Sequence, residues 1–179
     1  MSRCWFGFTG IWGLSEFKIC FPLNVHFIKS FSSTLNSKQL QQKLIKTLNN
    51  LNRKPLCFEE ITIPTIPNSE ILFEFGIAEE ECFNFLDEQE INRTLILLKT
   101  AQSLLDFFCV IRYYRYYSQK KTALKFDYYM VRVRFTAKNA EFHIFHKQGP
   151  RYITPEELVT MIVDNINKAS VKQLLEENT

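Results

Sequence analysis

Hydrophobic residues recur at three- and four-residue spacing in three stretches of the chain, which is the pattern of an amphipathic helix. The first stretch begins at Ser37 and ends before Pro55, because proline disfavours the helical conformation in the residue that precedes it. The second follows Asp87 and the third follows Thr154, two residue types that cap helix N-termini well. The predicted helices span residues 37–51, 88–106 and 155–168.

Hydrophobic and polar residues alternate through much of the stretch from residue 107 to residue 147, which predicts antiparallel strands. The stretch is rich in aromatic and β-branched residues, and Lys138-Asn139 suits a tight turn within it. Strands are predicted at 108–117, 126–135 and 141–146, with two weaker ones at 58–63 and 70–75. We expect the acidic piece at 78–86 to be a short helix or a surface turn, and the tail after Lys168 to be a frayed helix.

Together these elements predict an α+β domain in which an antiparallel sheet is covered on one face by about three helices. A chain of 179 residues fits one domain, which we place at residues 36–179. Residues 1–35 differ in composition, because they are rich in Phe and Trp and Glu16 is their one acidic residue. We interpret them as an N-terminal extension that is either a targeting segment or disordered. No hydrophobic run in them reaches the roughly 18 residues of a membrane-spanning helix.

The net charge of +3 hides a strong segregation of charge along the chain. Lys and Arg outnumber Asp and Glu by 8 to 1 in residues 1–55 and by 10 to 2 in residues 110–151. Acidic residues dominate by 11 to 2 in residues 56–109 and by 5 to 2 in residues 152–179. Such segregation predicts either a basic surface that meets an anion or two oppositely charged faces within one molecule.

Alternation along the predicted strands places Arg132 and Arg134 on the sheet face away from the helices, together with either Arg112 or Arg115. Cations neutralise phosphates, and aromatic rings stack on unpaired bases. We therefore expect a non-catalytic nucleic-acid-binding module, with single-stranded DNA or RNA as the favoured ligand. The predicted nucleic-acid-binding residues are Arg112, Tyr114, Arg115, Tyr116, Lys120, Lys121, Arg132, Arg134, His143, Lys147 and Arg151.

Two other classes of function fit part of the same pattern. Tyr and Arg are also enriched at interface hot spots, so the chain could be an accessory or assembly subunit whose basic, aromatic face binds a protein partner or another copy. Asp127, Glu141 and either His143 or Lys147 fall on adjacent strands, as do the Mg²⁺-binding carboxylates of metal-dependent nucleases. Charge pairs between carboxylates and arginines of neighbouring strands explain the same residues without a metal. We therefore expect a role other than catalysis.

The cysteines and glycines exclude several common kinds of site. The five cysteines are widely spaced and form neither a CxxC pair nor a Cys/His cluster, so the sequence predicts neither a disulfide framework nor a zinc site. With 5 glycines, the chain has no Gly-rich phosphate loop, and we predict no cofactor. Reduced cysteines indicate an intracellular location in the cytoplasm or nucleoid, or in the mitochondrial matrix if residues 1–35 are a transit peptide.

Overall fold

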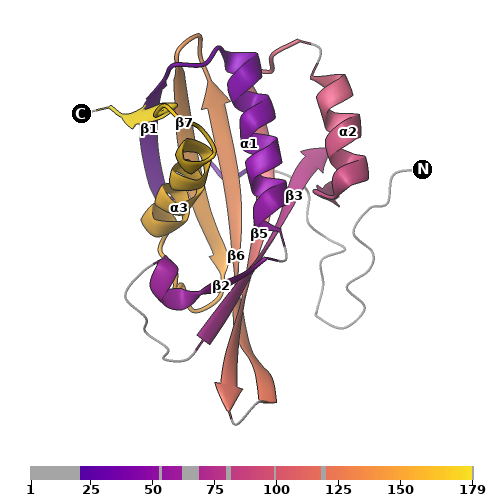
Figure 1. The fold of residues 1–179 in the computed structure, drawn as a ribbon, viewed down its shortest axis with the longest axis vertical. Helices are drawn as coiled ribbons and strands as arrows, with labels where there is room; N and C mark the ends of the chain where they lie inside the picture. The colour runs from indigo at the N-terminus through magenta and orange to yellow at the C-terminus, as the bar shows by residue number, and fades with distance from the viewer. Residues whose placement is uncertain are drawn as a thin grey trace.

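The described part of the chain forms one antiparallel sheet with helices packed on one of its faces (Figure 1). The computed structural model describes residues 21–52, 54–61, 69–79, 82–98, 100–117 and 120–178. Within these ranges the helices are α1 (Ser37–Leu51), α2 (Glu88–Leu97) and α3 (Pro155–Lys168). The predicted α+β class is confirmed.

The sheet has eight strands within the described ranges, in the order β2-β3-β5-β6-β7-β1-β8, with β4 paired to the other half of β3. Every strand pairing is antiparallel. The strands are β1 (Phe27–Ser33), β2 (Pro55–Cys57), β3 (Ser69–Glu79), β4 (Cys82–Phe85), β5 (Leu104–Tyr117), β6 (Lys120–Phe135), β7 (Asn139–Gln148) and β8 (Leu175–Glu177).

The main core lies between the helices and one face of the sheet, because every second residue of the long strands points toward the helices. Phe107, Ile111 and Val131 on this face are almost completely buried. The apolar stripes of α1 and α3 cover them, and the same periodicity set the predicted bounds of both helices. α3 starts at the predicted cap Thr154, which forms a capping box with Glu157, whereas Asn36 caps α1.

Two predicted elements differ from the structure in the middle of the chain. The second helix ends at Leu97 instead of residue 106, and β5 begins at Leu104. A short run such as Leu104–Phe108 fits the helical and the extended period equally well, so the local pattern does not decide between them. Phe58–Glu60 forms a 3₁₀ turn in place of the predicted strand 58–63, whose residues 62 and 63 lie outside the described ranges.

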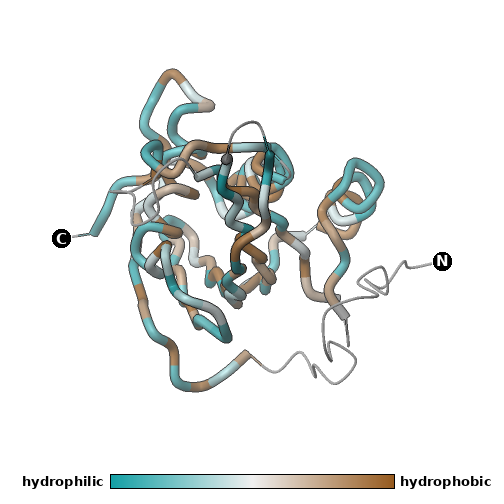
Figure 2. Tube along the Cα trace, turned by 90° about the horizontal axis from the view of Figure 1, so that it is seen from below, coloured by the Kyte–Doolittle hydropathy of each residue, from teal (hydrophilic) through white to brown (hydrophobic). Residues whose placement is uncertain are grey.

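Three strands occupy segments where the sequence predicted something else. β4 replaces the expected acidic helix or turn, and β8 replaces the frayed helix of the tail. β1 lies within the segment that we assigned to the N-terminal extension, and it pairs with β7 and β8. The sheet therefore begins before residue 36, and the described chain before β1 runs along the face that points away from α1 and α2 (Figure 2).

Asn52, just after α1, fills a gap in the edge of the sheet. β2 and β4 pair with opposite halves of β3, and between them the side chain of Asn52 takes the place of a strand. Its Oδ1 accepts a hydrogen bond from the Phe75 amide at 2.6 Å, and its Nδ2 donates to the carbonyls of Phe75 at 3.1 Å and Leu86 at 2.9 Å. Asn52 thus supplies the acceptor for the Phe75 amide and a donor for the Leu86 carbonyl, whereas the Phe75 carbonyl also accepts a hydrogen bond of 3.0 Å from the Leu86 amide.

We predict that Asn52→Ala lowers the free energy of unfolding by about 2 to 4 kcal/mol, because three hydrogen bonds are lost and the Phe75 amide of β3 loses its acceptor. Asn50→Ala is the matched control, since Asn50 is exposed near the end of the same helix. Urea denaturation followed by circular dichroism measures both. Equal stability of the two variants would show that Asn52 does not close the edge of the sheet.

Candidate functional site

The sheet face that points away from the helices, here called the outer face, has a hydrophobic centre. Phe108, Val110 and Met130 meet there and are 5%, 1% and 5% exposed. Aromatic side chains pack around them; these belong to Phe21, Phe83, Phe126, Tyr128 and Phe145. The middle of the predicted basic face is therefore a small second core.

Arginines flank this second core, and acidic residues of the same chain neutralise two of them. Arg132 donates two hydrogen bonds of 2.7 Å to the carboxylate of Asp106, and its guanidinium lies 4.4 Å from the centre of the Phe21 ring. The hydrogen bond with Asp106 raises the pKa of Arg132. Arg112 makes an ion pair of 2.9 Å with Glu74, and both side chains are largely buried. A phosphate at this face would have to compete with these carboxylates.

His143 and Glu141 form a further polar pair on the outer face. Nε2 of His143 lies 2.5 Å from Oε1 of Glu141, and Ser30 donates a hydrogen bond of 3.3 Å to the same carboxylate. The hydrogen bond from His143 lowers the pKa of Glu141, against the effect of partial burial. Arg134, which is exposed, pairs directly across from Glu141 in the β6–β7 ladder.

The far ends of β5 and β6 form a hairpin that extends beyond β7 (Figure 1), which we call the hairpin arm and define as residues 112–125. β3 still pairs with its base, and the pairs Tyr116–Lys121 and Tyr117–Lys120 lie beyond β3. β3 ends at Ser69, opposite Arg115, and β7 ends at Gln148, opposite Tyr128. Arg and Lys occur five times in residues 112–125, and Asp and Glu do not occur. The arm is thus the part of the sheet where the basic segment projects from the body of the protein.

Glu70 of β3 forms hydrogen bonds with two side chains on the outer face of the arm. Glu70 accepts hydrogen bonds from Lys121 and, at 2.6 Å, from the hydroxyl of Tyr116. Lys121 Nζ also lies 4.3 Å from the centre of the Tyr114 ring. Burial alone would raise the pKa of Glu70, but the hydrogen bonds from Lys121 and Tyr116 lower it, so Glu70 is a carboxylate.

Arg115 and Lys120 lie on the opposite face of the arm. The register pairs Arg115 with Thr122 and Tyr117 with Lys120, one position away from Tyr116 and Lys121. Since side chains alternate, the side chains of Arg115 and Lys120 point to the same side of the sheet as the helices. Lys120 is exposed, and among the described residues no ion pair is found for it.

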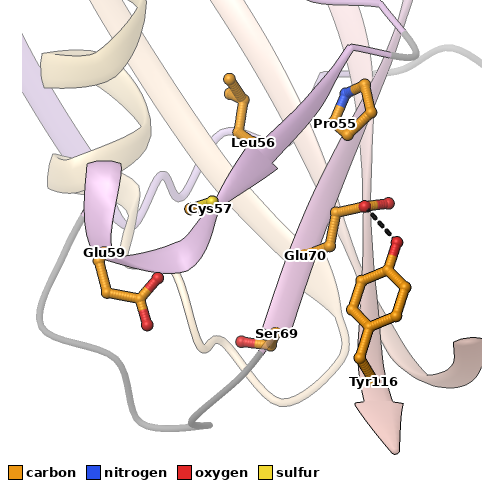
Figure 3. Close-up of a pocket in the computed structure, with 7 residues that line it drawn as sticks. All are labelled: Pro55, Leu56, Cys57, Glu59, Ser69, Glu70 and Tyr116. Atoms are coloured by element: carbon orange, nitrogen blue, oxygen red, sulfur yellow. Dashed lines mark hydrogen bonds between the residues drawn. The ribbon is translucent and has the colours of Figure 1, made fainter. Parts of the chain in front are cut away.

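A shallow pocket of about 450 Å³ lies at the base of the arm (Figure 3). The hydrogen bond between Glu70 and Tyr116 borders it on one side, while the side chain of Glu59 turns away from the other lining residues. Its lining residues are Pro55, Leu56, Cys57, Glu59, Ser69, Glu70 and Tyr116. This lining includes no Lys, Arg or His, so it offers no cation to hold a phosphate.

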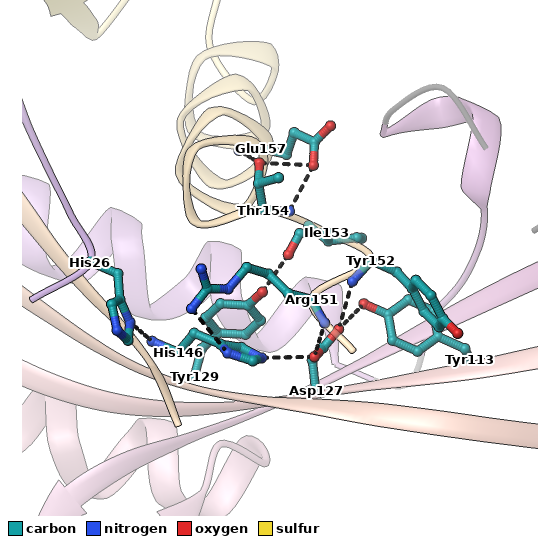
Figure 4. A network of polar contacts seen from close by, with 10 residues as sticks. All are labelled: His26, Tyr113, Asp127, Tyr129, His146, Arg151, Tyr152, Ile153, Thr154 and Glu157. Atoms are coloured by element: carbon teal, nitrogen blue, oxygen red, sulfur yellow. Dashed lines mark hydrogen bonds and ion pairs between the residues drawn. The ribbon is translucent and has the colours of Figure 1, made fainter. Parts of the chain in front are cut away.

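Asp127 is completely buried on the helix-bearing face and accepts four hydrogen bonds (Figure 4). The donors are the hydroxyl of Tyr113 at 2.6 Å and Nε2 of His146 at 2.8 Å, together with the amides of Arg151 at 2.7 Å and Tyr152 at 3.1 Å. Burial and the neighbouring Asp127 carboxylate raise the pKa of Tyr113 far above its usual range, so its hydroxyl remains a donor. All the hydrogen-bonding positions of Asp127 are thus used within the protein.

The loop after β7 is shaped to approach this carboxylate closely. Gly149 has φ of 120°, and a Cβ at this position would lie 2.3 Å from Oδ1 of Asp127. Arg151 adopts φ of 57°, which brings its amide to the same oxygen. Asp127 and Glu141 lie on opposite faces of the sheet, so the two carboxylates predicted for a nuclease-like metal site cannot hold one ion. Among the described residues, no group of His, Cys, Asp and Glu side chains could bind a metal.

The structure divides the predicted nucleic-acid-binding residues among four places. Arg115 and Lys120 lie on the helix-bearing side of the arm, and Arg151 lies in the loop beside Asp127. Lys147 is exposed where the β6–β7 register shifts. The outer face brings together Arg112, Tyr114, Tyr116, Lys121, Arg132, Arg134 and His143. The sequence prediction missed Glu74 and Asp106, because their pairing depends on how β3, β5 and β6 align.

No family model, no curated protein and no solved structure matches the chain. In the part of the chain that the structure describes, no helix has both the length and the hydrophobicity needed to cross a membrane. Function must therefore be inferred from the geometry of the outer face, the hairpin arm and the Asp127 site.

We predict that Asp127→Asn lowers the free energy of unfolding by about 2 to 4 kcal/mol, because the new amide group can only donate where two donors already point. Asp164→Asn on the exposed side of α3 is the control, with the same chemical change. Denaturant unfolding of both variants tests the prediction. A fully stable Asp127→Asn variant would mean that the four hydrogen bonds do not hold the fold together.

Proposed function

We propose that this protein is a non-catalytic nucleic-acid-binding module that uses the hairpin arm as its principal contact. The observation that carries the proposal is the hairpin arm, which has five Lys and Arg residues and no acidic residue in positions 112–125. Glu74 and Glu70 of β3 pair with Arg112 and Lys121, whereas Lys120 and Lys125 are exposed. A cationic projection neutralises phosphates, releases counterions and draws nucleic acid toward the protein from a distance.

The arm supports this function better than the centre of the outer face does. Arg132, beside the hydrophobic centre, already has a carboxylate partner within 3 Å, as does Arg112 at the base of the arm. Lys120 and Lys125 are exposed on the arm, and no ion pair is found for either within the described residues. Phosphate contacts made by these lysines would not require an internal ion pair to be broken.

A protein partner is the second candidate, in which the chain acts as an accessory or assembly subunit. It is favoured by the outer face, where charges are paired within the chain and exposed Leu104 adds to the hydrophobic residues. A largely neutral face with aromatic and apolar groups is typical of protein interfaces.

We predict that the double variant Lys120→Gln/Lys125→Gln binds nucleic acid more weakly, and that the slope of log affinity against log salt falls by about 1.4 to 1.8. Fluorescence anisotropy of the full chain with a labelled 20-nucleotide single strand and its duplex, at several salt concentrations, measures both quantities. The loss follows from the removal of two phosphate contacts.

Lys46→Gln/Lys172→Gln is the matched control, because both residues are exposed, lie away from the arm and change the net charge equally. We expect this control to keep most of the affinity of the unmodified protein. Equal losses in both double variants would indicate binding through net charge alone and would contradict a site on the arm. Absence of binding at low salt would favour the protein partner.

A further inference from the structure

We propose that His26 is a pH-sensitive latch, which fastens the chain before β1 to the edge of β7 and releases it when the imidazole is protonated. The latch is built from His26, from Phe145 and His146 of β7, and from Arg151 of the loop that follows β7. It goes beyond the proposed function, because it concerns how the protein itself responds to acid and does not need nucleic acid.

The residue just before β1 continues the pairing at the edge of β7 by means of its side chain. The pairing of β1 with β7 ends at Phe27, which lies opposite Ile144. The amide of His26 donates to the carbonyl of Ile144 at 2.8 Å. Nδ1 of His26 accepts a hydrogen bond of 2.9 Å from the amide of His146 (Figure 4). The imidazole thus gives an acceptor to an edge amide that has no residue of β1 opposite it.

Only the neutral imidazole of His26 can make this hydrogen bond to β7. A backbone amide always donates, so Nδ1 must carry no proton, and the proton of the neutral ring is on Nε2. A second proton would go to Nδ1, where it would turn the acceptor into a donor that faces the donor of His146. Protonation of His26 therefore breaks the contact.

The charges around His26 also oppose its protonation. The charged groups that face it are Arg151 and, when protonated, His146. Partial desolvation is the largest cause that lowers the pKa of His26, and the positive charges of Arg151 and His146 lower it further. Among the described residues no acidic side chain forms an ion pair with His26, and Asp127 accepts from the ring of His146 instead. The surroundings of His26 thus favour its neutral form.

His26 holds one end of a short segment that begins at Phe21. Its ring stacks on Phe145, with the ring centres 4.8 Å apart and the planes 12° from parallel. At the other end of the segment, Phe21 packs against the second core and lies 4.4 Å from the guanidinium of Arg132. Leu23, between these two points, is fully exposed. Release of His26 therefore uncovers Phe145 and loosens the segment.

The sign of the pH dependence follows from the preference of the closed latch for the neutral imidazole. When the latch opens, His26 is hydrated and away from Arg151, so it takes up a proton more readily than it does in the closed latch. The closed latch is fully favoured above a pH of about 6.5, where an ordinary His is mostly neutral, and is lost as the pH falls below that value.

Hydrogen exchange of the His146 amide tests the latch, followed by NMR on the full chain and expressed as a protection factor. In the unmodified protein we expect protection to fall about five- to tenfold from about pH 7.5 to about pH 5. His26→Asn keeps an acceptor near the position of Nδ1 but does not titrate, so the amide should stay protected throughout. His26→Phe keeps a ring on Phe145 but offers no acceptor, so the amide should have low protection throughout.

His143→Gln is the matched control, because it removes another imidazole that lies near the same edge and leaves His26 in place. It should keep the pH-dependent loss of protection at His146. Protection that falls equally in His26→Asn, or that stays constant in the unmodified protein, would overturn the latch. An equal fall at the amide of Val131, in the centre of the sheet, would indicate global unfolding by acid and would overturn it as well.

Discussion

The buried carboxylate of Asp127 is the interaction on which the arrangement of the central strands depends. It joins β6 to Tyr113 of β5, to His146 of β7 and to the loop that leads into α3. An isolated charge at this depth would be strongly unfavourable, so each donor is needed to offset the loss of hydration. The same loop also accepts a hydrogen bond from Tyr129 at the carbonyl of Ile153, which fixes the start of α3 above the sheet.

Asp127 also lies at the root of the hairpin arm. The last pairing between β6 and β7 is at Tyr128, which is next to Asp127 in the sequence. The arm therefore leaves the body of the sheet beside the buried carboxylate that Tyr113 and the other three donors contact. Tyr113, two positions further from the body than Ile111, links the other strand of the arm to the same carboxylate. A projecting ribbon that starts from a fixed base loses little conformational entropy when it binds, which favours affinity.

The sequence predicted those parts of the fold that are set by local signals. α1 and α3 combine helical periodicity with capping residues, and their predicted bounds agree with the structure. β1 could not be placed in the same way, because its partner β7 lies more than 100 positions away and the aromatic residues before it suggested a separate segment. The start of β5 was missed since a short apolar run does not distinguish a helix from a strand.

The sequence shows that positive and negative charges are segregated along the chain. Which charges meet in space depends on the register of strands that are distant in sequence. The basic segment 110–151 folds against the acidic segment 56–109, so that Glu74 meets Arg112 and Asp106 meets Arg132. Segregation in sequence thus becomes neutralisation in space over most of the outer face. Exposed positive charge remains on the arm at Lys120 and Lys125, for which no ion pair is found among the described residues. For this reason we propose the arm, and not the face of the sheet, as the contact with nucleic acid.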